Sequence, residues 1–340
     1  MIMKIFVSIA AYQDPMLIET LASAFVKAKN PENLVFCILD QNDDQLEVKK
    51  IKFRKQIIYK HIDPSLARGP CWARRRIQEL YTNEDYYLQI DSHTIFQKNW
   101  DELLIAYHSW VKKGLNKKFV ITGYPRSFKI KNTIHANETI FRMSTSHPYT
   151  LGITFRENRF FEDGHYSMQK NFKPVKTIFE PVLGLLVGGG FIFSEGDFIN
   201  EIPYDELLYF HGEELNLALR LFTNDWKIVH IPRIPLFHQY TDVKNLTRKL
   251  HWSPEDEINR SVKWHELDKK SKERLTKIII GEITGIYGLG KYRSLQEFSA
   301  LCGLDILNKK IIDYDRATKG LWMEPLNIKQ NFKEIEFKNK

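Results

Sequence analysis

Apolar and polar stretches alternate along the first hundred residues in a β/α rhythm. Buried strands are predicted at 4–10, 34–39, 56–62 and 86–90. An apolar stripe with helical spacing follows Asp14-Pro15, and Gly69-Pro70 begins a second helix that runs to Leu80. Strands that alternate with helices form a largely parallel sheet covered on both faces, so the predicted fold class is α/β with a Rossmann-like sheet.

Beyond residue 115 the alternation of predicted strands and helices is less regular. Further strands are predicted at 119–122, 139–143, 151–155 and 226–231. The apolar run from Val182 to Phe193 predicts a strand that three glycines, Gly188 to Gly190, interrupt. After residue 240 the chain turns basic and helical, first over 246–252, and Gly285, Gly288 and Gly290 indicate a turn.

Composition narrows the class of protein. A chain of 340 residues with 43% hydrophobic content can bury a full globular core. The formal charge of +8 is spread over many segments, so anionic ligands are favoured and nucleic acid is not expected as a partner. The three cysteines lie far apart, which predicts a reducing compartment rather than a disulfide framework or a zinc site. Without a signal peptide or a long apolar run, a soluble protein that starts at Met1 is expected.

Polar residues follow three of the predicted strands. They are the segments Ala10 to Asp14, Asp40-Gln41 and Asp91-Ser92-His93. The carboxyl ends of parallel strands meet at one edge of a sheet, so these segments should line a common crevice. The first strand is not followed by Gly-x-Gly-x-x-Gly and the chain has no Walker loop, which argues against a dinucleotide dehydrogenase and a P-loop enzyme.

Asp91 and His93 are candidate metal ligands. Two residues apart on an extended chain, they point the same way. A carboxylate beside an imidazole suits a divalent ion such as Mn²⁺, and an incomplete set leaves positions open for the phosphate oxygens of a sugar nucleotide. The alternative is an ordinary strand end that is solvated or caps a helix. His238, expected in a loop after the strand at 226–231, is a candidate third ligand, whereas His230 is interpreted as structural.

Charged residues at two predicted helix starts add further candidates. Arg74 lies one turn after Gly69-Pro70, where it can pair with a phosphate or a carboxylate, whereas Arg75 and Arg76 are interpreted as a solvated face. Glu213 and Glu214 fall in the first turn of another helix. Acidic side chains are stabilised there by the helix dipole, and this is enough to explain the presence of one of them. The pair can also bind sugar hydroxyls or accept a proton. The glycines at 188–190 leave room for a sugar ring, or else form a bulge.

Taken together, these segments resemble the cytoplasmic hydroxyproline-directed polypeptide N-acetylglucosaminyltransferases of glycosyltransferase family 60. The matching segments are 8–14, 69–74, 87–93, 188–190, 212–214 and 237–238, with a looser similarity at 287–293. Part of the series also resembles the mucin-type polypeptide N-acetylgalactosaminyltransferases, whose Asp-x-His and Gly-Glu-Asn segments stand in the same order. The resemblance implies a glycosyltransferase A (GT-A) fold, with residues 1–240 as catalytic domain and 241–340 as a helical, basic extension.

The resemblance also implies a Mn²⁺-dependent (or Mg²⁺-dependent), retaining transferase that uses a UDP-sugar, with N-acetylglucosamine as the leading donor sugar. The implied metal ligands are Asp91, His93 and His238. The implied donor-binding residues are Ser8, Ala10, Tyr12, Asp14, Asp40, Arg74, Asp91, Gly189 and Gly190, and the catalytic candidates are Glu213 and Glu214. Of these, Tyr12, Asp14 and Asp40 would lie around uridine, Arg74 near the diphosphate, and the glycines and glutamates around the sugar.

The acceptor stays open between a protein hydroxyl, a growing glycan and a lipid-linked saccharide. Residues 157–174 are interpreted as an irregular lid or acceptor loop. The basic extension can serve as an acceptor platform or contact an anionic membrane surface, so the expected location is the cytoplasm, with peripheral contact to the inner face of a membrane as a variant. The rival classes are a metal-dependent hydrolase or nucleotidyltransferase, and a non-enzymatic module that binds nucleic acid or a protein partner.

Overall fold

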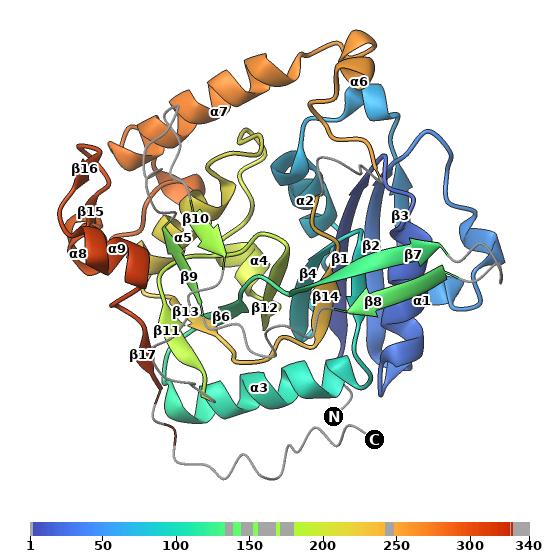
Figure 1. The fold of residues 1–340 in the computed structure, drawn as a ribbon, viewed down its shortest axis with the longest axis horizontal. Coiled ribbons are helices and arrows are strands. Elements are labelled where there is room, and N and C mark those ends of the chain that lie inside the picture. Colours follow the sequence, from blue (N-terminus) through green and yellow to red (C-terminus); the bar gives the residue numbers. More distant parts are fainter. Residues whose placement is uncertain are drawn as a thin grey trace.

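The computed structural model describes residues 3–132, 139–143, 152–155, 168–170, 180–241, 248–326 and 328 (Figure 1). A central sheet is built from β1 (Ile5–Tyr12), β2 (Leu34–Gln41), β3 (Ile57–His61), β4 (Tyr86–Asp91), β6 (Phe119–Thr122), β11 (Val182–Gly184), β12 (Phe191–Glu195), β13 (Lys227–His230) and β17 (Glu324–Pro325). These nine strands lie in the order β17-β11-β13-β6-β12-β4-β1-β2-β3.

The sheet is parallel in one half and mixed in the other. Strands β3, β2, β1 and β4 are parallel neighbours, which confirms the four predicted N-terminal strands to within one or two residues. Strand β12, however, runs antiparallel to both β4 and β6, and β11 runs antiparallel to β13. The prediction of a largely parallel sheet therefore holds only for the N-terminal half, because the later segments return to the sheet without the regular β/α rhythm.

Helices cover both faces of the sheet. Alternate residues of β1 point to opposite sides, so that Ile5, Val7 and Ile9 pack with α1 (Leu17–Lys27) and α3 (Trp100–Gly114). Phe6 faces the other side, where α2 (Pro70–Gln78) and α5 (Glu213–Thr223) complete the second core, together with α4 (Phe198–Glu201). Strand β1 is thus buried on both faces, as its continuous apolar run predicts.

A smaller sheet lies against the carboxyl end of β4. It consists of β5 (Thr94–Phe96), β14 (Leu236–His238), β7 (Arg126–Asn132) and β8 (Thr139–Met143), in the order β5-β14-β7-β8. Strand β14 pairs antiparallel with β5, which sets His238 opposite Thr94. The expectation that His238 lies in a loop is therefore wrong: pairing with β5 fixes its backbone, and the residue is 8% exposed.

The three consecutive glycines do not interrupt one strand. They lie in the connection between β11 and β12, which are separate strands at different places in the central sheet. Strand β11 pairs with β13, whereas β12 lies between β4 and β6. Strand β11 already ends at Gly184, and the segment 188–190 lies directly before β12, where glycine suits a tight change of direction.

The C-terminal part is mainly helical. It contains α6 (Pro254–Ile258), α7 (Trp264–Ile279), α8 (Leu295–Cys302) and α9 (Tyr314–Lys319), with a short pair of strands, β15 (Leu304–Asp305) and β16 (Lys310–Ile311). The helix predicted at 246–252 is absent from its described part, 248–252. Strand β17 joins the central sheet, and the division at residue 240 stays a prediction.

Two further strands, β9 (Ile153–Phe155) and β10 (Met168–Lys170), pair with each other outside the central sheet. Apart from β10, the predicted lid or acceptor loop at 157–174 lies outside the described residues. Among the helices that the structure describes, none has the length and apolar character needed to cross a membrane.

Candidate active site

A cavity of about 1060 Å³ opens at the carboxyl end of the parallel strands. Eleven of the candidate residues line it: Ala10, Tyr12, Asp14, Arg74, Asp91, His93, Gly189, Gly190, Glu213, Glu214 and His238. Two other candidates do not. Ser8 is buried in the middle of β1, and Asp40 accepts a hydrogen bond from the Tyr59 hydroxyl at 2.7 Å, while its neighbour Gln41 reaches the cavity. The predicted convergence of strand ends is confirmed.

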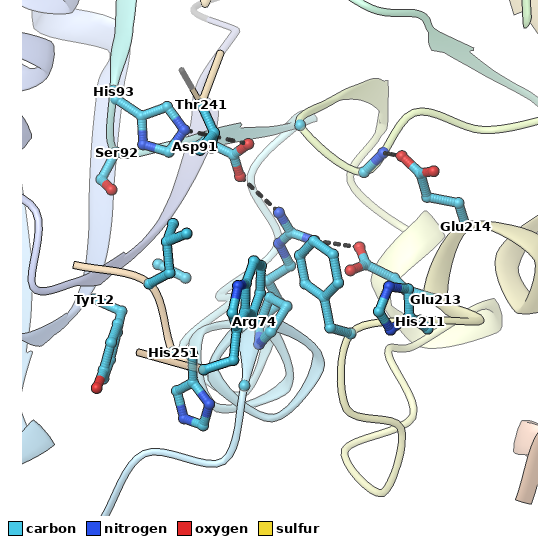
Figure 2. Close-up of a pocket in the computed structure, with 18 of the residues that line it drawn as sticks. Tyr12, Arg74, Asp91, Ser92, His93, His211, Glu213, Glu214, Thr241 and His251 are labelled. Atoms are coloured by element: carbon cyan, nitrogen blue, oxygen red, sulfur yellow. Dashed lines mark hydrogen bonds and ion pairs between the residues drawn. The ribbon is translucent and has the colours of Figure 1, made fainter. Parts of the chain in front are cut away.

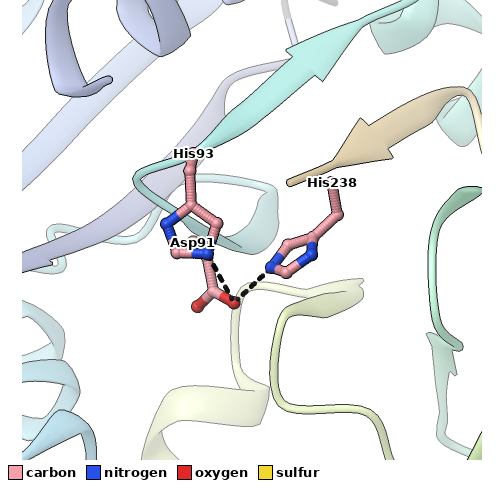
Figure 3. A group of neighbouring side chains, drawn as sticks. All are labelled: Asp91, His93 and His238. Atoms are coloured by element: carbon pink, nitrogen blue, oxygen red, sulfur yellow. Dashed lines mark hydrogen bonds and ion pairs between the residues drawn. The ribbon is translucent and has the colours of Figure 1, made fainter. Parts of the chain in front are cut away.

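Asp91, His93 and His238, which all line this cavity, form a compact group (Figure 3). Each offers one ligand atom, and the three atoms lie within 4.8 Å of one another. The Asp91 Oδ2 atom is 3.0 Å from His238 Nε2 and 3.9 Å from His93 Nε2. Strand β4 delivers Asp91, and the pairing of β14 with β5 brings His238 to it from about 150 residues further along the chain.

Asp14 orients one of these histidines. Its Oδ2 atom lies 2.6 Å from His93 Nδ1 and accepts a hydrogen bond from the Ser92 hydroxyl at 2.6 Å. Burial alone would raise the pKa of Asp14, but these hydrogen bonds outweigh burial and hold the pKa below its usual value. A carboxylate that binds the far nitrogen of a metal-ligating histidine is a common support for a metal site. One carboxylate, two imidazoles and this supporting acid fit a divalent ion such as Mn²⁺.

Arg74 connects the metal-ligand group with the carboxylates of α5. Its Nη2 atom donates to Asp91 Oδ1 at 2.7 Å, and its Nη1 atom donates to Glu213 Oε1 (Figure 2). The arginine is 5% exposed, whereas the Asp91 side chain keeps 25% of its surface exposed. Arg76, on the same helix, pairs instead with Glu79 and Glu206 near the surface. Of these two arginines of α2, Arg74 is thus the one that lines the cavity.

Glu213 and Glu214 lie at the start of α5 and bind different partners. Glu213 Oε1 accepts a hydrogen bond from the Tyr204 hydroxyl at 2.8 Å in addition to that from Arg74. Glu214 accepts from the Gly189 backbone N–H at 2.8 Å and from the Tyr124 hydroxyl at 2.7 Å. Both carboxylates are therefore fixed in position beside the glycine segment rather than exposed at a free helix end.

The glycines at 189 and 190 are required by close packing against charged groups. A Cβ atom at Gly190 would lie 2.8 Å from Asp91 Oδ2, and one at Gly189 would lie 2.5 Å from Glu213 Oε1. Any side chain here would displace a carboxylate of the site. The absence of side chains keeps both carboxylates in place and leaves the cavity open next to them.

Three residues that contact the two glutamates or the glycine segment were not identified from the sequence. Tyr124 and Tyr204 gave no signal, because neither belongs to a recognisable motif. Gln89 gave a weak one, since it is a polar side chain in the apolar strand β4. Its Nε2 atom donates to the Gly189 carbonyl and to the Tyr204 hydroxyl, both at 2.6 Å, so it links the glycine segment to the partners of Glu213.

We expect Glu214 to make stability depend on pH. Burial, partly offset by hydrogen bonds from Gly189 and Tyr124, raises the pKa of Glu214 to about 7 from 4.5. Between these values the folded state holds a proton that the unfolded state has released, so the folded protein loses stability as pH rises. Glu214→Gln removes this titration, and the wild type should lose about 3 kcal/mol relative to the variant between pH 4.5 and 8.

Urea unfolding at several pH values measures this difference. Glu282→Gln, at an exposed glutamate, is the control and should follow the wild type throughout. If the free energy of unfolding changes with pH in the same way in Glu214→Gln and in the wild type, burial does not raise the pKa of this carboxyl.

Comparisons with known proteins are consistent with this geometry. A family model described as "Glycosyltransferase (GlcNAc)" matches residues 4–47 and 42–308. No curated protein matches the chain in sequence. The crystal structure of GalNAc-T7 with UDP, GalNAc and Mn²⁺ is similar, with 16% identity and a TM-score of 0.53 over 92% of this chain and 58% of that chain. The chain thus spans 58% of the GalNAc-T7 chain, and the likeness shows a GT-A fold.

A second solved structure, Staphylococcus aureus TarS residues 1–349, has 14% identity and a TM-score of 0.43, over 82% of this chain and 72% of that chain. The same TarS segment in complex with UDP-GlcNAc gives 12% identity and a TM-score of 0.43, over 82% of this chain and 73% of that chain.

Proposed function

The chain belongs to the GlcNAc glycosyltransferase family, and from this premise we propose that it transfers N-acetylglucosamine from UDP-GlcNAc to a hydroxyl group of a protein or glycan acceptor. The observation that carries the proposal is the grouping of Asp91, His93 and His238 in a large cavity at the carboxyl end of the parallel strands. This is the edge at which open α/β sheets bind nucleotides.

In this proposal the three ligands hold Mn²⁺ or Mg²⁺, which neutralises the diphosphate of the donor when bound. Asp14 keeps the His93 imidazole in the orientation that turns Nε2 towards Asp91. Arg74 adds a buried positive charge between the metal-ligand group and α5. Tyr12, at the end of β1, lies on the wall of the same cavity, where an aromatic ring can contact the uracil base.

The donor sugar would occupy the space beside Gly189 and Gly190. Glu213 and Glu214, fixed by Arg74 and by the Gly189 backbone, are placed to accept hydrogen bonds from sugar hydroxyls. In the transfer step the acceptor oxygen bonds to C1 as the C1–O bond to the β-phosphate breaks. The acceptor proton passes to the leaving phosphate oxygen, which balances the reaction without an enzymatic nucleophile.

The finer assignments are proposals that rest on the sequence resemblance. They are membership of glycosyltransferase family 60, retention of configuration at C1, and a cytoplasmic location with peripheral membrane contact. The division into a catalytic domain at 1–240 and an extension at 241–340 has the same status. The family match continues to residue 308, and β17 joins the central sheet. Residues beyond 240 therefore belong to the matched region and contribute a strand to the sheet.

A donor panel tests the proposed function. The purified chain is incubated with Mn²⁺ and UDP-GlcNAc, UDP-GalNAc or UDP-galactose, and UDP release is measured together with direct binding by titration calorimetry. We expect UDP-GlcNAc to be turned over at least about tenfold faster than the other donors, with activity lost in EDTA and restored by Mn²⁺. A protein that binds none of the donors, or that binds RNA equally with and without EDTA, would contradict the proposal.

A further inference from the structure

The cavity measures about 1060 Å³, at the upper end of the range of about 300 to 1000 Å³ that is typical of small-molecule sites. Its wall extends from Tyr12, at the end of β1, past the metal-ligand group to α7. Figure 2 shows Tyr12 and His211 on different sides of the Arg74–Asp91 pair, with His211 next to Glu213. The cavity therefore has a second end beyond the proposed position of the donor sugar.

This second end combines aromatic rings with hydrogen-bonding groups. It is lined by Phe210, His211, Trp252, Trp264, Asp268 and Lys272. Phe210 and Trp252 are 41% and 39% exposed, and their ring centroids lie 5.2 Å apart at an interplanar angle of 61°. Asp268 lies between His211 and Lys272, at 3.2 Å from Nδ1 and 2.9 Å from Nζ respectively.

The aromatic end is held rigidly by α7. The Ser271 hydroxyl accepts from the Tyr209 backbone N–H at 3.0 Å and donates to the His211 carbonyl at 3.2 Å. On the other side, the Tyr209 hydroxyl lies 2.7 Å from Nδ1 of His251, the residue before Trp252. The loop that carries Phe210 therefore leads into Glu213 in a fixed geometry. Large exposed aromatic side chains that are fixed in this way favour a binding role.

The chemistry of this end matches a sugar ring. A pyranose presents a face of C–H groups, which packs on aromatic rings, and a rim of hydroxyls, which pair with carboxylate, imidazole and ammonium groups. A peptide that binds as an added strand instead needs the edge of a sheet. The described residues at this end come from two loops and α7, and none belongs to a strand edge.

Resting on the proposed function, we infer that the acceptor is a saccharide whose sugar ring packs on Phe210 and Trp252. Its reactive hydroxyl then points along the cavity towards Gly189 and Glu213. The loops that carry Phe210 and Trp252, together with α7, thereby supply acceptor specificity, while the parallel strands supply the donor site.

Two arrays test this inference with the full chain, Mn²⁺ and UDP-GlcNAc. One carries neutral and charged saccharides, and the other carries peptides with serine, threonine and hydroxyproline. We expect transfer to saccharides, and for the best of them a KM that rises at least about tenfold in Phe210→Ala and Trp252→Ala. Trp252→Phe should recover most of the affinity. The control is Tyr292→Ala, at an aromatic residue that is 79% exposed and outside the cavity.

Each outcome separates the inference from the proposed function. Transfer to peptides alone, or an unchanged saccharide KM in both alanine variants, overturns the saccharide assignment. UDP-GlcNAc hydrolysis without transfer to either array also overturns it, while the donor site stands. A wild-type chain that neither binds nor hydrolyses UDP-GlcNAc refutes the proposed function itself. Thermal unfolding of each variant checks that the fold is intact, and Phe210→Leu or Trp252→Leu, which removes the aromatic ring but keeps apolar bulk, replaces an alanine variant that does not fold.

Discussion

Asp91→Asn should strongly weaken metal binding and sugar transfer while leaving the protein folded. The amide keeps the shape of the side chain and an oxygen that accepts the hydrogen bond from Arg74, but it removes the negative charge and the carboxylate ligand. With two imidazoles left, we expect Mn²⁺ affinity to fall by about 100-fold and transfer by about 1000-fold, equal to about 4 kcal/mol of activation free energy. Titration calorimetry with Mn²⁺ measures the first effect and UDP release the second.

The matched control is Asp305→Asn, at a surface aspartate of β15 that bonds Asn308 and lies outside the cavity. It should bind Mn²⁺ and transfer sugar like the wild type. His238→Ala should resemble Asp91→Asn in the calorimetric experiment, because it removes another member of the same group. Wild-type Mn²⁺ affinity in both site variants would refute the metal assignment, whatever happens to the activity.

The first half of the fold follows from local pattern. Strands β1 to β4 and the helices between them are encoded by apolar runs and helix-start residues that lie close together in the sequence. The connection at Gly188 to Gly190 is different. The same apolar run contains β11 and β12, and only long-range pairing with β13 and with β4 decides that they separate. Register between distant strands is not visible in a local pattern.

The candidate site also combines residues that have a local sequence signal with residues that depend on long-range contacts. Asp91, His93 and Arg74 follow local signals, a strand end and a helix start, and the structure brings them together. His238 was identified as a residue but placed in the wrong kind of segment, because its strand exists only through pairing with β5. The two tyrosines that bind Glu213 and Glu214 carry no signal at all, since a tyrosine hydroxyl finds its partner only in the folded chain.

Arg74→Lys should cost both stability and activity, although it keeps the positive charge. Arginine donates from two nitrogens to Asp91 and Glu213, and a single ammonium on a shorter, unforked side chain cannot reach both in the same geometry. One carboxylate is then left without its buried partner, which should lower the free energy of unfolding by about 3 kcal/mol. Transfer should fall by about 100-fold, because Glu213 and the metal ligand Asp91 lose their common support.

Arg76→Lys is the matched control, two positions further along α2. Arg76 pairs with Glu79 and Glu206, and its side chain is 36% exposed, so the exchange should change stability by less than about 1 kcal/mol and leave transfer unchanged. Urea unfolding and UDP release on the two variants separate a bridge inside the cavity from an ordinary surface ion pair. Equal effects in the two variants would mean that Arg74 contributes only to the packing of α2. A large effect confined to Arg74→Lys would instead mean that one guanidinium couples the metal-ligand group to the sugar-side carboxylates.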